Sequence, residues 1–161
     1  ASQMQNKGQL IALDIYESKL KKLKKRARRN GVHNVETRVI DSNKVIKKLH
    51  NSADRVLLDA PCSGLGVIKR NPDSKWKLEP EFVDRIMGVQ QEILQNYSKM
   101  VKKGGQMVYA TCSILPQENS EQVKTFLASE NGKEFEFVRE RNVFASETGF
   151  DGFYMALLKR K

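Results

Sequence analysis

The sequence contains few cysteines and histidines and no long hydrophobic run, and each shortage excludes a class of protein. Its 161 residues include two cysteines and two histidines, which show neither the spacing of a metal site nor a C-x-x-C pair. No apolar run approaches the roughly 20 residues of a membrane span. The first residues lack the charged and apolar regions of a signal peptide. We therefore expect a cytoplasmic protein that binds no metal and no membrane and keeps its thiols reduced.

Positive charge is abundant and unevenly distributed. The length predicts one domain over residues 1–161, and the net charge is +10. Residues 1–50 hold 13 Lys and Arg against four Asp and Glu. Most of this excess falls on seven residues: Lys21, Lys22, Lys24, Lys25, Arg26, Arg28 and Arg29. Such a run attracts polyanions, nucleic acid above all, and the alternative is a solvated helix face.

Strand-like and helix-like patterns alternate along the chain. Apolar runs predict strands at residues 10–13, 35–40, 53–58 and 106–111. Helical periodicity covers residues 15–30, 44–49, 80–101 and 117–129. Two late strands, 135–139 and 153–158, lie close enough in sequence to pair antiparallel. This order predicts an α/β fold with a mostly parallel sheet and a C-terminal antiparallel pair.

Each cysteine lies in a loop that directly follows a predicted strand. Cys62 belongs to Asp59-Ala60-Pro61-Cys62-Ser63-Gly64-Leu65-Gly66, and Cys112 belongs to Ala110-Thr111-Cys112-Ser113-Ile114-Leu115-Pro116. If the two strands are parallel neighbours, about 4.8 Å apart, both thiols sit where open α/β sheets bind ligands. The pattern therefore favours a site at which the cysteines take part in a reaction. The alternatives are cysteines buried as small hydrophobes and a redox pair that exchanges thiol for disulfide.

Three aspartates also end predicted strands. Asp14 occupies the position at which a doubly wound sheet binds ribose hydroxyls, and Asp41 follows the next strand, where it can face an adenine amino group. With Asp59, they favour a nucleoside-containing cofactor over simple helix caps. Only 13 residues precede Asp14, and none of them forms G-x-G-x-x-G. We therefore expect the first strand and its Gly-rich loop to be missing from this chain.

Several motifs occur in an order that carries a specific resemblance. They are Asp59-Ala60-Pro61-Cys62-Ser63-Gly64-x-Gly66, Arg70-Asn71-Pro72-Asp73-x-Lys75-Trp76, Thr111-Cys112-Ser113, Pro116-x-Glu118-Asn119 and Asp151-Gly152-Phe153-Tyr154-Met155-Ala156. Over nearly all 161 residues the chain resembles the catalytic domain of the NOL1/NOP2/Sun family of RNA cytosine-5 methyltransferases, its bacterial Sun branch in particular. The resemblance implies a Rossmann-like methyltransferase fold that uses S-adenosylmethionine, without its N-terminal part.

The resemblance also implies roles for individual residues. Cys112 would be the nucleophile, and Cys62 the second cysteine, which assists product release. Asp59 would contact the target base and lie beside the cofactor. Asp14 would bind the ribose of the cofactor, and Asp41 would bind its adenine. These roles suit the chemistry, because a thiolate added to cytosine C6 makes C5 nucleophilic enough to attack a methyl group. The family's Gly-rich loop matches no segment here, so we expect weak cofactor binding by these residues alone.

A basic stretch after the first cysteine loop contains the single tryptophan. We expect an RNA-facing rim there, in which an aromatic ring stacks beside phosphate contacts. The residues expected to contact RNA are Pro61, within the first cysteine loop, and Lys69, Arg70, Lys75, Trp76 and Lys77, after it. A place in the core is the alternative for Trp76. Ribosomal RNA is the expected substrate and transfer RNA the next, while a non-catalytic RNA-binding fragment is the rival function.

Overall fold

The computed structural model covers residues 1–161 and describes all of them except the side chain of Lys77. The place expected for that side chain on the RNA-facing rim therefore lies outside the described residues. The chain divides into two compact units, Ala1–Lys48 and Leu49–Lys161, and each unit has its own sheet.

The first unit is a strand–helix–strand arrangement. Its elements are the 3-10 turn η1 (Ser2–Met4), β1 (Leu10–Asp14), α1 (Glu17–Arg29), β2 (Val35–Val39) and α2 (Asn43–Lys47). Strands β1 and β2 are parallel, and their register runs from Leu10 opposite Val35 to Asp14 opposite Val39. Helix α1 connects them and ends before Gly31, whose φ of 63° suits glycine. All four longer elements lie within three residues of their predicted bounds.

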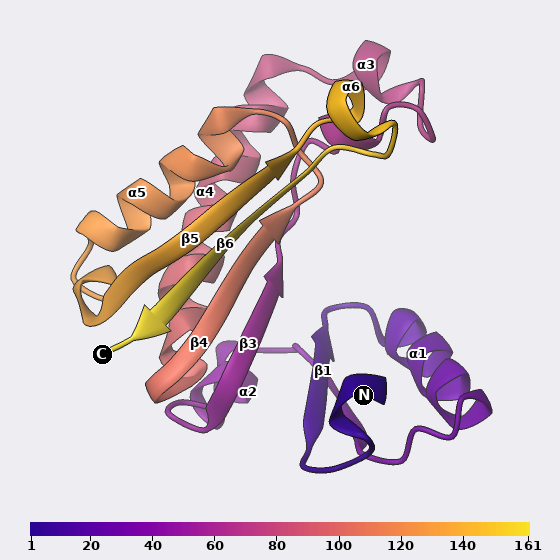
Figure 1. Cartoon of the computed structure of the whole chain (residues 1–161), viewed down its shortest axis with the longest axis vertical. Coiled ribbons are helices and arrows are strands. Elements are labelled where there is room, and N and C mark those ends of the chain that lie inside the picture. The colour runs from indigo at the N-terminus through magenta and orange to yellow at the C-terminus, as the bar shows by residue number, and fades with distance from the viewer. The chain divides into compact units, whose positions relative to one another are not determined.

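The second unit contains a four-stranded sheet flanked by two long helices (Figure 1). Its elements are β3 (Ala53–Asp59), η2 (Leu65–Val67), α3 (Ser74–Lys77), α4 (Pro80–Tyr97), η3 (Ser98–Met100), β4 (Val101–Thr111), η4 (Pro116–Glu118), α5 (Ser120–Ala128), η5 (Gly132–Glu134), β5 (Phe135–Val143), α6 (Ala145–Thr148) and β6 (Phe153–Arg160). The strand order is β3-β4-β6-β5.

Strand directions in this sheet agree with the prediction. Strands β3 and β4 pair in parallel, while β6 pairs antiparallel with both β4 and β5. It follows that β3, β4 and β5 run in one direction and that only β6 opposes them. The mostly parallel sheet and the C-terminal antiparallel pair are both confirmed.

One face of the sheet packs on α4 and α5 and forms the core (Figure 1). Alternate residues of β4 and β6 point into it, because successive side chains of a strand face opposite sides. Met107 and Tyr109 of β4, Leu158 of β6, Leu94 of α4 and Phe126 of α5 are completely buried. This core fixes the ends of β3 and β4, from which the two cysteine loops depart.

The boundary between α4 and β4 differs from the prediction. Helical periodicity continues in the sequence to residue 101, yet α4 ends at Tyr97 and β4 begins at Val101. Val101 pairs with Ala53, while the next pair is Arg55 with Gln106. The additional residues of β4 form a bulge, in which Gly104 has a φ of 75°. The apolar side chain at 101 therefore matched the helical period while belonging to a strand.

The core position of Leu94 predicts a large effect on stability. We expect Leu94→Ala to lower the free energy of unfolding by about 2–5 kcal/mol, because it leaves a cavity in a fully buried site. Val89 lies on the same helix with 37% of its surface exposed. Val89→Ala is therefore the matched control and should change stability by less than about 0.5 kcal/mol. Urea unfolding followed by circular dichroism measures both; equal losses would contradict the assigned core.

Candidate active site

The two cysteine loops leave the sheet at the same edge. Asp59, the last residue of β3, pairs in register with Ala110 of β4. The pairing continues one residue further, where the Ala60 N–H donates to the Ala110 carbonyl at 2.9 Å. Parallel pairing therefore brings the loops side by side at the carboxyl ends of neighbouring strands, as the sequence predicts.

The thiols of Cys62 and Cys112 lie in direct contact. Their Sγ atoms are 3.4 Å apart, and both cysteines are free and half-buried. The hydrogen bond from the Cys62 thiol lowers the pKa of Cys112 to about 7, against burial and the nearby negative charges of Asp59 and Glu118. The same contact, together with burial, raises the pKa of Cys62. Cys112 is therefore the more acidic thiol and is partly ionised at neutral pH, whereas Cys62 keeps its proton there.

A buried polar cluster lies beside the thiols. The carboxylate of Glu118 accepts hydrogen bonds from both Ser63 and Ser113, each of which directly follows a cysteine. It also accepts one from Gln90 Nε2 at 3.2 Å. The sequence motif that contains Glu118 is part of the family resemblance, but its contribution to the site was not predicted. The signal was available: a serine follows each cysteine, and a run of polar residues follows Pro116.

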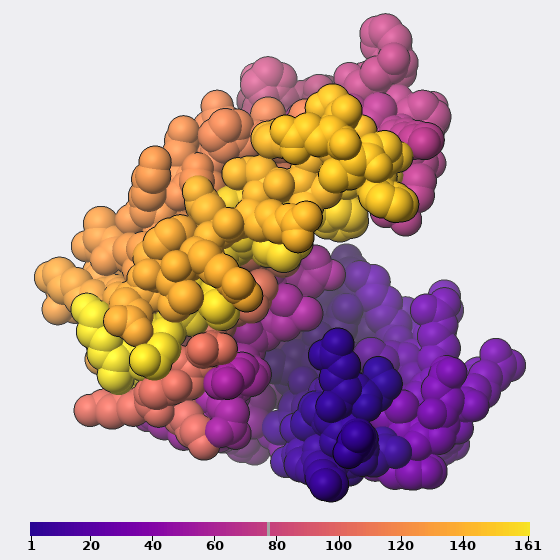
Figure 2. Space-filling view, viewed as in Figure 1, coloured from indigo at the N-terminus to yellow at the C-terminus, as the bar shows by residue number. Residues whose placement is uncertain are grey.

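A third segment, between α6 and β6, packs against the cysteine loops. The Gly66 N–H donates to the Cys112 carbonyl at 2.9 Å, and the Gly152 N–H donates to the Gly66 carbonyl at 2.7 Å. A Cβ at Gly66 would lie 2.1 Å from the Gly152 carbonyl oxygen, so only glycine fits there. The stretch between α6 and β6 thus lies against the loop after β3 (Figure 2).

The three strand-end aspartates are divided between the two units. Asp59 lies exposed at the cysteine edge of the second unit. In the first unit, Asp14 Oδ1 accepts the Tyr16 N–H at 2.8 Å, at the turn into α1. Asp41 is exposed, and its Oδ1 accepts the Ser42 hydroxyl at 2.9 Å. Asp14 also forms an ion pair with Lys19 through Oδ2 at 3.7 Å, whereas the second oxygen of Asp41 has no hydrogen bond or ion pair among those described.

The residues predicted for RNA contact whose side chains the structure describes are exposed. Trp76 is 80% exposed, so its alternative place in the core is wrong. The Lys75 ammonium lies 4.9 Å from the centroid of the Trp76 ring. Lys69 is exposed, as is Pro61, whose carbonyl accepts Gln90 Nε2 at 2.9 Å.

One predicted RNA contact also has a structural partner. Arg70 forms an ion pair with Asp151 at 2.6 Å, which links the loop after β3 to the start of β6. Phe150, two residues after α6, is 75% exposed. Helices α3 and α6 lie at the same end of the second unit's sheet (Figure 1).

The seven basic residues between Lys21 and Arg29 are all exposed on α1. Within the part of the chain that the structure describes, no helix is long and apolar enough to cross a membrane. Nor do the described side chains include a group of three or more His, Cys, Asp or Glu that could hold a metal ion.

Solved structures identify the class of protein that this fold defines. The fold matches NSun6 from Pyrococcus horikoshii, solved with SFG, an analogue of S-adenosylmethionine. The TM-score is 0.85 at 26% identity, over 99% of this chain and 43% of that one. The fold is that of the S-adenosylmethionine-dependent methyltransferases, as predicted.

The sequence comparisons narrow this class to a family. The family described as 16S rRNA methyltransferase RsmB/F matches residues 1–159. The chain belongs to this family, and the resemblance to the Sun-type enzymes is confirmed.

Two curated relatives illustrate the match. The chain is 37% identical to the ribosomal RNA small subunit methyltransferase B of Proteus mirabilis, over 96% of this chain and 36% of that protein. It is 34% identical to the probable ribosomal RNA small subunit methyltransferase B of Bacillus subtilis, over all of this chain and 40% of that protein. The chain thus spans well under half the length of these relatives.

The thiol contact predicts the pH dependence of cysteine alkylation. In the unaltered protein, Cys112 should react with iodoacetamide with a midpoint near pH 7. Cys62→Ala removes the donor that stabilises the thiolate, so the midpoint should rise to about 8.5 or above, the ordinary thiol range. Mass spectrometry of the labelled peptides measures both midpoints. An unchanged midpoint would show that the neighbouring thiol has no part in the acidity of Cys112.

Proposed function

We propose that the protein methylates C5 of cytosine in ribosomal RNA through a covalent bond between Cys112 and C6. The observation that carries this proposal is the thiol pair, 3.4 Å apart at the carboxyl edge of the sheet, with Cys112 as the more acidic thiol. The names of the curated relatives support ribosomal RNA as the substrate.

The acidity of Cys112 suits the first step. Its thiolate adds to C6, and the electrons of the C5–C6 double bond are displaced into the ring, so that C5 becomes nucleophilic. A thiol with a pKa near the working pH combines a large thiolate fraction with retained nucleophilicity. Asp59, exposed at the same edge, is in a position to hydrogen-bond the amino group and N3 of the cytosine while charge develops there.

The second thiol suits the last step. After methyl transfer the C5 proton must leave, and the electrons of that bond expel the Cys112 sulfur and restore the double bond. The main cause of the raised pKa of Cys62 is its contact with Cys112. That contact weakens once the Cys112 sulfur is bonded to C6, so Cys62 then ionises more easily. Cys62, or a water that it orders, accordingly takes the C5 proton.

The strand-end carboxylates fit the cofactor. S-adenosylmethionine supplies the methyl group when it is bound. Asp14 and Asp41 are acceptors at the carboxyl ends of β1 and β2, where a ribose hydroxyl or an adenine amino group can donate to them; Asp14 would accept beside its ion pair with Lys19. Asp59, in the second unit, is the third residue that the sequence predicts to contact the cofactor.

The exposed basic and aromatic residues fit single-stranded RNA. Trp76 offers an open ring face for base stacking, and Lys69 and Lys75 supply phosphate contacts. Arg70 acts partly through its ion pair with Asp151, so its substitution also loosens the loop after β3.

A trapping experiment tests this function. RNA that contains 5-azacytidine has nitrogen in place of the C5–H group, so the elimination that frees the cysteine is blocked. With S-adenosylmethionine present, the unaltered protein and Cys62→Ser should both form an adduct that survives denaturing electrophoresis. Cys112→Ser should form none. Loss of the adduct in Cys62→Ser alone would reverse the two roles.

The rival function is RNA binding without catalysis, which the seven exposed cations between Lys21 and Arg29 favour. Such binding would weaken steeply with salt and ignore both Cys→Ser substitutions. RNA binding without any adduct in the trapping experiment would support this rival. An adduct with transfer RNA in preference to ribosomal RNA would change the substrate and leave the chemistry intact.

A further inference from the structure

Glu118 is a carboxylate that is completely buried, and all four of its described hydrogen-bond partners are uncharged donors. Oε1 accepts the Ser63 N–H at 2.7 Å and Gln90 Nε2 at 3.2 Å. Oε2 accepts the Ser63 hydroxyl at 2.5 Å and the Ser113 hydroxyl. Four donors match the acceptor capacity of one carboxylate. Burying such a group without a cation is costly, so its retention indicates a function.

The donors come from both cysteine loops. Ser63 directly follows Cys62, and Ser113 directly follows Cys112. In each loop the serine Oγ also accepts the backbone N–H two residues on, from Leu65 at 3.4 Å and from Leu115 at 3.1 Å. Each hydroxyl hydrogen is therefore directed to the shared carboxylate, which joins the loops one residue away from each thiol.

Glu118 is itself held firmly. Its carbonyl accepts the Tyr109 hydroxyl at 2.8 Å, which ties it to β4. The next residue, Asn119, accepts the Thr111 hydroxyl at 2.5 Å and donates to the Ser113 carbonyl at 3.0 Å. The carboxylate is thus fixed relative to the end of β4. The Cys62 loop is bound to it through Ser63.

We propose that Glu118 is the positioning residue of the thiol pair: its buried carboxylate holds Ser63 and Ser113 together, and so keeps the Cys62 and Cys112 sulfurs in hydrogen-bonding contact. The effect on the thiols stands on geometry alone, while its consequence for catalysis rests on the proposed function.

A purely electrostatic role predicts the opposite result. The charges and titratable groups that face the thiols are Asp59, Glu118 and Tyr109. As a negative charge, Glu118 raises the pKa of Cys112, so its removal alone would make that thiol more acidic. As a positioning residue, Glu118 maintains the thiol contact, which is the largest cause of the lowered pKa. Its removal would then make Cys112 less acidic.

Two substitutions at position 118 separate these roles. Glu118→Gln keeps the size of the side chain but replaces one acceptor oxygen by a donor, which faces N–H or hydroxyl donors. Glu118→Asp keeps the charge but shortens the reach by one methylene, roughly 1.5 Å. We expect both variants to shift the alkylation midpoint of Cys112 from about 7 toward about 8.5. An unchanged or lowered midpoint in Glu118→Gln would overturn the proposal.

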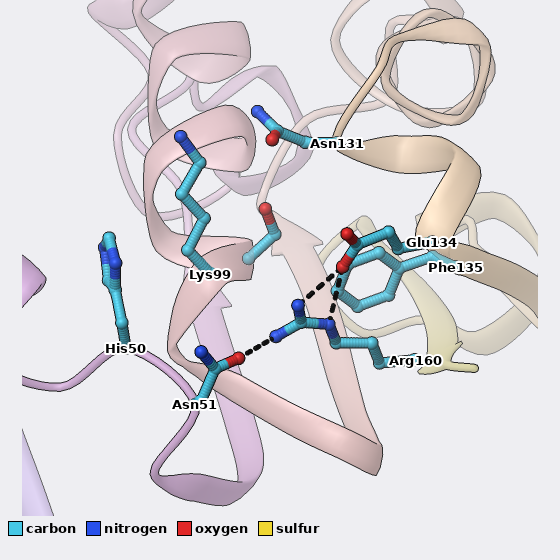
Figure 3. Close-up of a pocket in the computed structure, with 8 residues that line it drawn as sticks. His50, Asn51, Lys99, Asn131, Glu134, Phe135 and Arg160 are labelled. Carbon is cyan, nitrogen blue, oxygen red and sulfur yellow. Dashed lines mark hydrogen bonds and ion pairs between the residues drawn. The ribbon is translucent and has the colours of Figure 1, made fainter.

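A matched control comes from the other end of the same sheet. Glu134 binds the guanidinium of Arg160, through Nε at 2.9 Å, beside a polar pocket that also includes His50 and Lys99 (Figure 3). Arg160 ends β6, whose other end pairs with Thr111, so the two carboxylates are separated by most of an eight-residue strand, roughly 20 Å. Glu134→Gln should leave the Cys112 midpoint near 7.

A second variant covers the case in which Glu118→Gln does not fold, which circular dichroism would reveal. The double variant Ser63→Ala/Ser113→Ala removes both hydroxyl donors to Glu118 and keeps the carboxylate. It should raise the Cys112 midpoint in the same direction. A midpoint that stays near 7 in this folded variant would contradict the proposal.

Labelling uses neither RNA nor cofactor, so it is independent of the proposed function. Shifted midpoints together with no RNA adduct in the unaltered protein would remove the proposed function and leave the positioning role. An adduct in the unaltered protein together with unshifted midpoints would remove the positioning role and leave the proposed function. If both proposals hold, Glu118→Gln should slow adduct formation at pH 7 several-fold and recover toward pH 8.5, because the thiolate fraction is restored there.

Discussion

The parallel pairing of β3 with β4 is the constraint on which the site depends. With Asp59 opposite Ala110, both loops leave one sheet edge at the spacing of neighbouring strands. A slip of one residue in this register would turn one loop's side chains to the other face of the sheet. The thiol contact and the shared carboxylate each require this register. The core behind it, formed by β4, β6, α4 and α5, therefore serves the site by preventing that slip.

Two opposing electrostatic effects act on the thiol pair. Asp59, Glu118 and burial all disfavour a thiolate at Cys112, while a hydrogen bond from Cys62 favours it. The hydrogen bond prevails because the sulfurs are in contact at 3.4 Å, and charges at a greater distance act through a more screened medium. A negatively charged group that opposes the thiolate directly can thus support it indirectly, provided that it fixes the geometry of the loops.

The sequence predicted most of the fold, because strands and helices can be recognised from the local periodicity of their apolar residues. It failed at the end of α4, where Val101 fits a helical period yet pairs with Ala53 of β3. The bulge at Gly104 that permits this pairing depends on the neighbouring strand. Periodicity also gave no warning that Asn119 separates η4 from α5, since its side chain is engaged by Thr111 and Ser113.

The sequence by itself determined which loops carry the chemistry: each cysteine follows an apolar strand, and this order of motifs belongs to one family. Only the tertiary structure decided that the two sulfurs touch, that Trp76 is exposed and that Glu118 is the common acceptor of both loops. The physical reason is that these properties depend on which distant segments cover a side chain or supply its donors. Ser63 and Glu118 are 55 residues apart, and no local pattern encodes their contact.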